Sequence, residues 1–206
     1  MGIHDRYQRF FAWALARSGR QIESAVAVDK QALLADLSGT VLEIGPGAGA
    51  NLRYFPPDVR WIGVEPNRHL RRYLDREAAR LGREIELLHS GAEHIDLPAA
   101  SVDAAVSTHV LCSVDDLAAV VAEVARVLKP GGRFVFVEHV AAPRGTRLRR
   151  LQNLAQPRWT LAGEGCHPNR ETWRAIEAGG FTRVDIERFT IRAPLVAPHI
   201  KGTAWK

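Results

Sequence analysis

The sequence predicts an α/β protein in which a mostly parallel sheet carries helices on both faces. Short apolar runs rich in β-branched residues recur at 40–44, 61–64, 85–88, 102–107 and 133–139. Such runs are typical of buried parallel strands. Segments with apolar residues at helical spacing separate several of them. A glycine-rich loop follows the first run, where a doubly wound, Rossmann-like sheet places a nucleotide site.

The glycine loop contains Gly45, Gly47 and Gly49, at alternate positions. Glycine lets the backbone turn sharply and approach a ligand closely. Residues 51–55 are predicted to begin a helix after the loop. Glu65 stands twenty positions after Gly45, at the end of the second run. A carboxylate there can accept hydrogen bonds from both ribose hydroxyls. The alternative is a tight turn that binds no ligand.

Two features of this loop favour S-adenosylmethionine (SAM) over a dinucleotide. The third glycine comes one place earlier than in the dinucleotide fingerprint. Glu43 stands two places before the first glycine, and its carboxylate can meet a cationic amino group. SAM carries an ammonium group and no pyrophosphate. An NAD-dependent oxidoreductase is the alternative.

Composition predicts a single domain, residues 1–206, in the cytoplasm. The chain is 46% hydrophobic and 25% charged, which is ordinary for a globular protein. Its apolar stretch at 10–16 is short and lacks a signal-peptide cleavage site, so no transmembrane anchor is expected. Cys112 and Cys166 do not make a disulfide framework, which favours a reducing compartment. A net charge of +5 is weak support for a nucleic-acid partner.

Residues 1–38 are predicted to form a helical cap, with a break near Gly19, over the cofactor cleft or beside the substrate. The alternative is simple packing on the sheet. A helix capped by Asn67 and ended by Gly82 is predicted next.

The loop after the third run, Gly91-Ala92-Glu93, is expected beside the adenine ring. Ala92 would contact the ring, and Glu93 or a backbone amide would form a hydrogen bond with it. The alternative for Glu93 is a solvated charge.

The second half of the chain alternates in the same way. Ser113 or Asp115 is expected to cap a helix with an apolar stripe, and the segment 129–132 is expected to stop it. Asn169 is predicted to cap a further helix. Two alternating runs near 184–189 and 199–205 predict a final antiparallel hairpin.

The segment 144–166 contains five arginines interleaved with apolar residues and, up to residue 163, no acid. It is predicted to form a lid over the active site. Peripheral contact with a membrane or another anionic surface is the second interpretation. An exposed basic helix face is the third.

Three motifs resemble those of class I SAM-dependent methyltransferases: Glu43–Gly49, Val64–Asn67 and Val127–Phe134. The resemblance implies a seven-stranded sheet with a C-terminal antiparallel hairpin, SAM as cofactor and S-adenosylhomocysteine as product. More narrowly, the chain is similar to the methyltransferase-like 7 proteins, which are thiol S-methyltransferases. The stretches shared with them are 110–114, 138–142, 165–166, 170–173 and 197–202. Those relatives carry a hydrophobic N-terminal anchor, which is not expected here.

The expected reaction is in-line transfer of a methyl group to a small-molecule acceptor, with a thiol favoured. His109 and His139 are the candidate bases, because imidazole titrates near neutrality; a structural histidine is the alternative for each. No sequence spacing indicates a metal site. The expected cofactor-binding residues are Glu43, Gly45, Gly47, Gly49, Asn51, Glu65, Pro66, Gly91, Ala92, Glu93, Thr108 and His109.

Other functions remain open at this stage. One is O-, N- or C-methylation of a lipid-like or natural-product acceptor, motivated by the apolar and basic segment 147–161. Another is a SAM-binding regulatory or nucleic-acid-associated module without turnover, supported only by the arginine run. The sequence does not indicate an oligomeric state.

Overall fold

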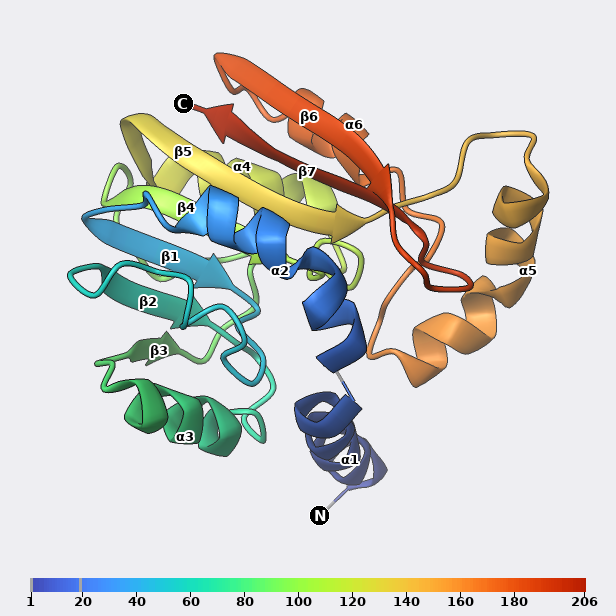
Figure 1. Ribbon diagram of the computed structural model, residues 1–206, viewed down its shortest axis with the longest axis horizontal. Coiled ribbons are helices and arrows are strands. Elements are labelled where there is room, and N and C mark those ends of the chain that lie inside the picture. The colour runs from blue at the N-terminus through green and yellow to red at the C-terminus, as the bar shows by residue number, and fades with distance from the viewer. Residues whose placement is uncertain (1, 19) are drawn as a thin grey trace.

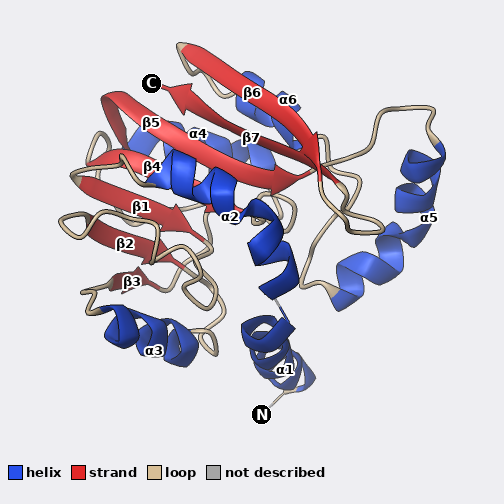
Figure 2. Cartoon of the chain, in the orientation of Figure 1, coloured by secondary structure: helices blue, strands red, loops and turns tan. Residues whose placement is uncertain are grey.

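The computed structural model describes residues 2–18 and 20–206, and its centre is one seven-stranded sheet (Figures 1 and 2). The strand order is β3-β2-β1-β4-β5-β7-β6. Strands β1 to β5 run parallel, whereas β7 is antiparallel to both β5 and β6. The predicted fold class is therefore confirmed. The strands are β1 (Thr40–Ile44), β2 (Arg60–Val64), β3 (Glu86–Leu88), β4 (Val102–Thr108), β5 (Leu128–His139), β6 (Arg183–Thr190) and β7 (Pro198–Trp205).

Helices cover both faces of the sheet and divide the core into two layers (Figure 1). Leu34, the last residue of α2, and Leu74 of α3 pack on one face, against residues such as Val41 of β1. Val120 of α4 and Ile176 of α6 pack on the other. The helices are α1 (Ile3–Ser18), α2 (Arg20–Leu34), α3 (Arg71–Leu81), α4 (Leu117–Val127), α5 (Arg147–Ala162) and α6 (Thr172–Glu177).

The helix expected at residues 51–55 does not form. Residues 47–54 instead make successive turns, with hydrogen bonds such as Gly49 N to Pro46 O at 2.9 Å and Tyr54 N to Asn51 O at 2.9 Å. A helix needs several consecutive residues in one conformation before its hydrogen bonds offset the lost entropy. The prolines at 56 and 57 end the segment before that length is reached.

Three predicted helix caps are wrong by a few residues. The N-cap of α3 is Leu70, not Asn67, and the side chain of Asn67 accepts a hydrogen bond from the amide of His69 in a local turn. Asp116 rather than Ser113 or Asp115 caps α4, through a bond from the Ala119 amide. Glu171 rather than Asn169 precedes α6. Gly82 ends α3 at φ 64°, as predicted.

The cap and lid segments have different positions. Helix α2 lies on the sheet, whereas α1 and α5 lie beyond the end of the sheet at which β1, β4 and β5 terminate (Figure 1). Gly19 lies outside the described residues. Some apolar side chains of α1 and α5 are exposed, including Phe10, Leu154 and Leu161. In the described part of the chain, none of the helices combines the length and the apolar character that crossing a bilayer requires.

Candidate active site

The glycine loop begins where β1 ends, and the backbone there is left-handed. Gly45, Gly47 and Gly49 have φ of 57°, 57° and 86°. A Cβ at Gly45 would lie 2.6 Å from a methyl group of Val110, so this glycine is needed for packing. A Cβ at Gly47 would meet only Leu15 of α1, at 3.4 Å. The open side of Gly47 is therefore where a ligand can approach the backbone.

Glu43 lies beneath this loop and is fully buried on β1. Its two carboxylate oxygens accept hydrogen bonds from Asn51 Nδ2 and Trp61 Nε1, both at 2.8 Å. Asn51 Nδ2 also donates to Thr108 Oγ1 at 3.1 Å, which ties the loop to the end of β4. Burial raises the pKa of Glu43 to about 7, and the two hydrogen bonds offset part of this rise. A direct contact with the cofactor's ammonium group stays a prediction.

Glu65 directly follows β2 and faces the glycine loop. Its carboxylate accepts hydrogen bonds from the amides of Gly47 at 3.2 Å and Asn67 at 2.9 Å. Burial raises the pKa of Glu65, and the two hydrogen bonds offset part of this rise. Pro66, next to it, is exposed. The predicted ribose-binding carboxylate is thus held beside the open side of Gly47.

Helix α1 and the loop after α5 meet beside Glu65. The amide of Asn67 Nδ2 donates to Glu164, in the loop after α5, at 3.0 Å. The backbone N–H of Glu164 donates to the hydroxyl of Tyr7 on α1 at 3.1 Å. Burial and the nearby Glu65 raise the pKa of Glu164 to about 7. Sequence analysis did not identify Glu164 or Tyr7 as site residues. Glu164 is 97 positions from Asn67 and 157 positions from Tyr7, so no local pattern relates them.

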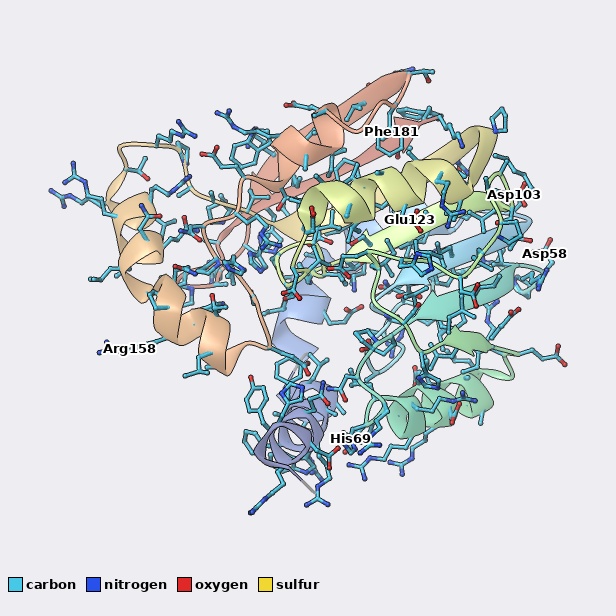
Figure 3. All side chains as sticks on the ribbon, turned by 180° about the vertical axis from the view of Figure 1, so that it is seen from behind. Asp58, His69, Asp103, Glu123, Arg158 and Phe181 are labelled. Atoms are coloured by element: carbon cyan, nitrogen blue, oxygen red, sulfur yellow. The ribbon has the colours of Figure 1, made fainter. Side chains whose placement is uncertain are left out.

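Helix α1 is held at this edge by ionic contacts as well. Asp5 accepts hydrogen bonds from Arg68 Nη2 at 2.6 Å and from His69 Nε2 at 2.8 Å. His69 lies beside α1 in Figure 3. The segment that follows Glu65 is therefore the anchor for the N-terminal helix.

The predicted adenine loop comes next along this edge. Ala92 is buried and belongs to the core layer formed with α4. Glu93 accepts a hydrogen bond from the Asp115 amide at 3.0 Å, so it is not simply a solvated charge. The hydroxyl of Ser90 is buried and lacks a partner among the described residues. Contacts of Gly91, Ala92 and Glu93 with adenine stay predictions.

His109 follows β4 with φ 57°, an uncommon conformation outside glycine that often marks a functional position. Its Nε2 lies 3.0 Å from Nε2 of His199 on β7. His199 Nδ1 lies 3.1 Å from the carbonyl of Ala197, which can only accept, so His199 donates there. Neutral His199 then accepts at Nε2. His109 is therefore the donor at Nε2 and keeps its lone pair on Nδ1.

Both histidines of this pair are neutral near pH 7. Burial, followed by the neighbouring His139 and His199, holds the pKa of His109 well below its usual range. Burial lowers the pKa of His199 to about 4. His109 is thus a weak base whose free nitrogen can accept a hydrogen bond or a proton.

His139, the last residue of β5, contacts a residue of the lid. Its Nε2 lies 3.2 Å from Sγ of Cys166, and Trp159 Nε1 donates to the same sulfur at 3.3 Å. Cys112 also reaches this place, so that one potential ligand atom from each of Cys112, His139 and Cys166 lies within 4.8 Å of the others. A hydrogen bond with Cys112, and then burial, raises the pKa of Cys166. Sequence spacing had not indicated this cluster.

The seven-stranded sheet, the glycine loop after β1 and the acid after β2 are those of a class I SAM-dependent methyltransferase. The "Methyltransferase domain" family matches residues 42–136. A SAM-dependent methyltransferase from Thermotoga maritima shares the fold, with a TM-score of 0.68 and 18% identity over 95% of this chain and 98% of that one. The [4+2]-cyclase SpnF gives a TM-score of 0.70 and 18% identity over 88% and 79%.

Relatives that match most of the chain identify the family within this class. The chain is 35% identical to human thiol S-methyltransferase TMT1A over 97% of its length and 87% of the relative. It is 37% identical to rat thiol S-methyltransferase TMT1B over 93% of its length and 82% of the relative. The chain therefore belongs to the family that contains TMT1A and TMT1B. SAM is its cofactor, and the contacts of Gly47 and Glu65 with that molecule stay predictions.

Proposed function

We propose that this enzyme transfers the methyl group of SAM to the sulfur atom of a small thiol. The observation that carries the proposal is the similarity, over more than nine tenths of the chain, to relatives named for thiol methylation. SAM supplies a methyl group on a positively charged sulfur, which is already a good leaving group. The protein then has to hold cofactor and acceptor in line.

The residues of the site divide this work. Gly47 and Glu65 are placed to hold the cofactor, and Glu43 fixes the loop through Asn51. His109 borders the acceptor side. Because the pKa of His109 is low, it suits an acceptor that needs little help in losing its proton. A thiol, with a reference pKa of about 8.5, is such an acceptor, whereas an alcohol is not.

A nucleic-acid module has less support than an enzyme of small molecules. Two of the arginines of the 144–166 segment, Arg144 and Arg149, form ion pairs with Glu171 at 2.9 and 3.0 Å. Their charge is therefore partly neutralised within the fold. Cytoplasmic location, peripheral membrane contact and the cap and lid roles of 1–38 and 144–166 stay predictions, as does an O-, N- or C-acceptor as the alternative.

The test is an assay with SAM against alkyl and aryl thiols, with phenols and amines beside them, that measures S-adenosylhomocysteine release and product mass. We expect turnover of thiols. His109→Ala should lower kcat/KM for thiols by about 100-fold, the low end of what a general base contributes, because a thiol needs little help in losing its proton. His94→Gln, on an exposed bend, should leave it unchanged. Turnover of phenols or amines without thiols would refute the proposed acceptor.

A further inference from the structure

The edge of the sheet where the acceptor is expected contains three side chains that favour soft metal ions. Cys112 follows β4, His139 ends β5, and Cys166 lies in the loop after the lid helix. They come from three separate segments, yet one donor atom from each lies within 4.8 Å of the other two. Cys112 and His139 are buried, whereas Cys166 is partly exposed.

The spacing of these atoms is close to that of ligands on one zinc ion. Zn–S and Zn–N bonds of about 2.3 and 2.0 Å at tetrahedral angles separate neighbouring ligand atoms by roughly 3.5 to 3.8 Å. His139 Nε2 and Cys166 Sγ are 3.2 Å apart. Small movements of side chains would therefore bring the three donors to coordination distance.

The surroundings suit a bound thiolate. Trp159 Nε1 donates to Cys166 Sγ at 3.3 Å, and Ser113 Oγ lies 3.4 Å from Cys112 Sγ. Donors of this kind stabilise sulfur that carries negative charge. Two thiolates and a neutral imidazole leave a divalent zinc site with no net charge, which lowers the cost of burying it.

We propose that Cys112, His139 and Cys166 bind one Zn²⁺ ion and leave its fourth position for the sulfur of the methyl acceptor. Three protein ligands and an open position are typical of catalytic zinc, whereas structural zinc is closed by four. When the acceptor binds, its S–H bond breaks, the sulfur keeps the electron pair and joins the zinc, and the proton passes to water through the free nitrogen of His109. The zinc stays divalent throughout.

The assignment of the fourth position rests on the proposed function, whereas the metal site itself does not. His109 supports the assignment, because its ring centroid lies 6.2 Å from that of His139 and it follows the adjacent strand β4. A thiol on the zinc would therefore lie on the side of the site that already contains the candidate base.

The first test measures metal binding alone. Purified protein should contain about one zinc per chain, and metal-free protein should bind one Co²⁺ with the sulfur-to-cobalt charge-transfer band of thiolate ligands. Cys166→Ala and Cys112→Ala should lose the band and weaken zinc binding by at least about 100-fold. His94→Gln is the matched control and should bind as the unchanged protein does.

The second test separates the metal from the acceptor. A small thiol added to the cobalt-loaded protein should shift the band, and a chelator should abolish thiol turnover while SAM binding, followed by calorimetry, persists. Full thiol turnover without metal would overturn the assignment of the fourth position and leave the proposed function standing. Absence of thiol turnover with a normal cobalt band would overturn the proposed function alone.

Two results would overturn the metal site. One is a metal-free protein that binds neither ion although its thermal unfolding is cooperative. The other is an intact mass lower by two hydrogens and restored by a reductant, since Cys112 and Cys166 would then form a disulfide. His139→Gln supplies an independent check on metal binding. It removes one proposed ligand and leaves both sulfurs in place, so it should weaken zinc binding without affecting the ability of Cys112 and Cys166 to form a disulfide.

Discussion

The buried carboxyl group of Glu43 should make the stability of this protein depend on pH in an unusual direction. Its pKa is about 7 in the folded protein, against a reference value of 4.5. Between these values the folded state holds a proton that the unfolded state has lost, so folding is favoured at low pH. The stabilisation is complete below the unfolded pKa and is lost as pH rises through 7. From about pH 5 to about pH 8 the loss amounts to roughly 2.5 kcal/mol.

Glu43→Gln provides the comparison, because glutamine does not titrate. Urea unfolding at about pH 5 and about pH 8 should show that the unchanged protein loses roughly 2.5 kcal/mol more than the variant over this interval. The difference between the two pH values cancels the hydrogen bond that glutamine makes poorly with Trp61 or Asn51. Equal pH dependence of the two proteins, or a larger loss in the variant, would refute a raised pKa at this position.

Two further predictions concern the cofactor site. Glu65→Gln should weaken SAM binding about 10- to 100-fold in calorimetry, because it replaces a charged hydrogen-bond acceptor; Glu86→Gln, at an exposed position of β3, is the control, and equal affinity in both would contradict the ribose role. Gly45→Ala should lower the melting temperature more than Gly47→Ala. Both positions have a positive φ, but of the two only the Cβ added at Gly45 would lie 2.6 Å from a neighbouring group. Gly47→Ala should instead lose SAM affinity, and a reversed order would show that the open side of the loop is misassigned.

The sequence was informative wherever a local pattern determines the structure. Apolar runs located the strands, and Gly82 marked the end of α3 because a left-handed residue favours glycine. The glycine loop and Glu65 were found because their spacing along the chain reflects their spacing across two adjacent strands. These features depend on residues that are close in sequence or that lie on two adjacent strands.

The errors arose where several local solutions compete. Asn67 has a side chain that can cap a helix, but it forms a turn and bridges to Glu164 instead. Residues 51–55 could have continued into a helix, but the following prolines left turns as the lower-energy choice. Neither outcome depends on composition alone, because tertiary contacts and chain breaks decide between alternatives of similar energy.

The cluster of Cys112, His139 and Cys166 and the histidine pair could not be predicted from spacing along the sequence. Cys112, His139 and Cys166 are far apart in the chain, and they meet because the loop after α5 lies against the ends of β4 and β5. His199 reaches His109 because β7 runs antiparallel beside β5, with His139 opposite His199 in the register. A pattern search confined to short spacings has no access to such contacts.

The position of β7 also makes the two halves of the site depend on different parts of the chain. Strand β6 precedes β7 in the chain, yet β7 lies between β5 and β6. The glycine loop and Glu65 follow β1 and β2, which pair with strands from residues 40–108. His109 instead takes the partner that fixes its tautomer, His199, from the C-terminal hairpin of β6 and β7. A change that loosens this hairpin would therefore disturb the histidine pair and leave the strands around the glycine loop paired.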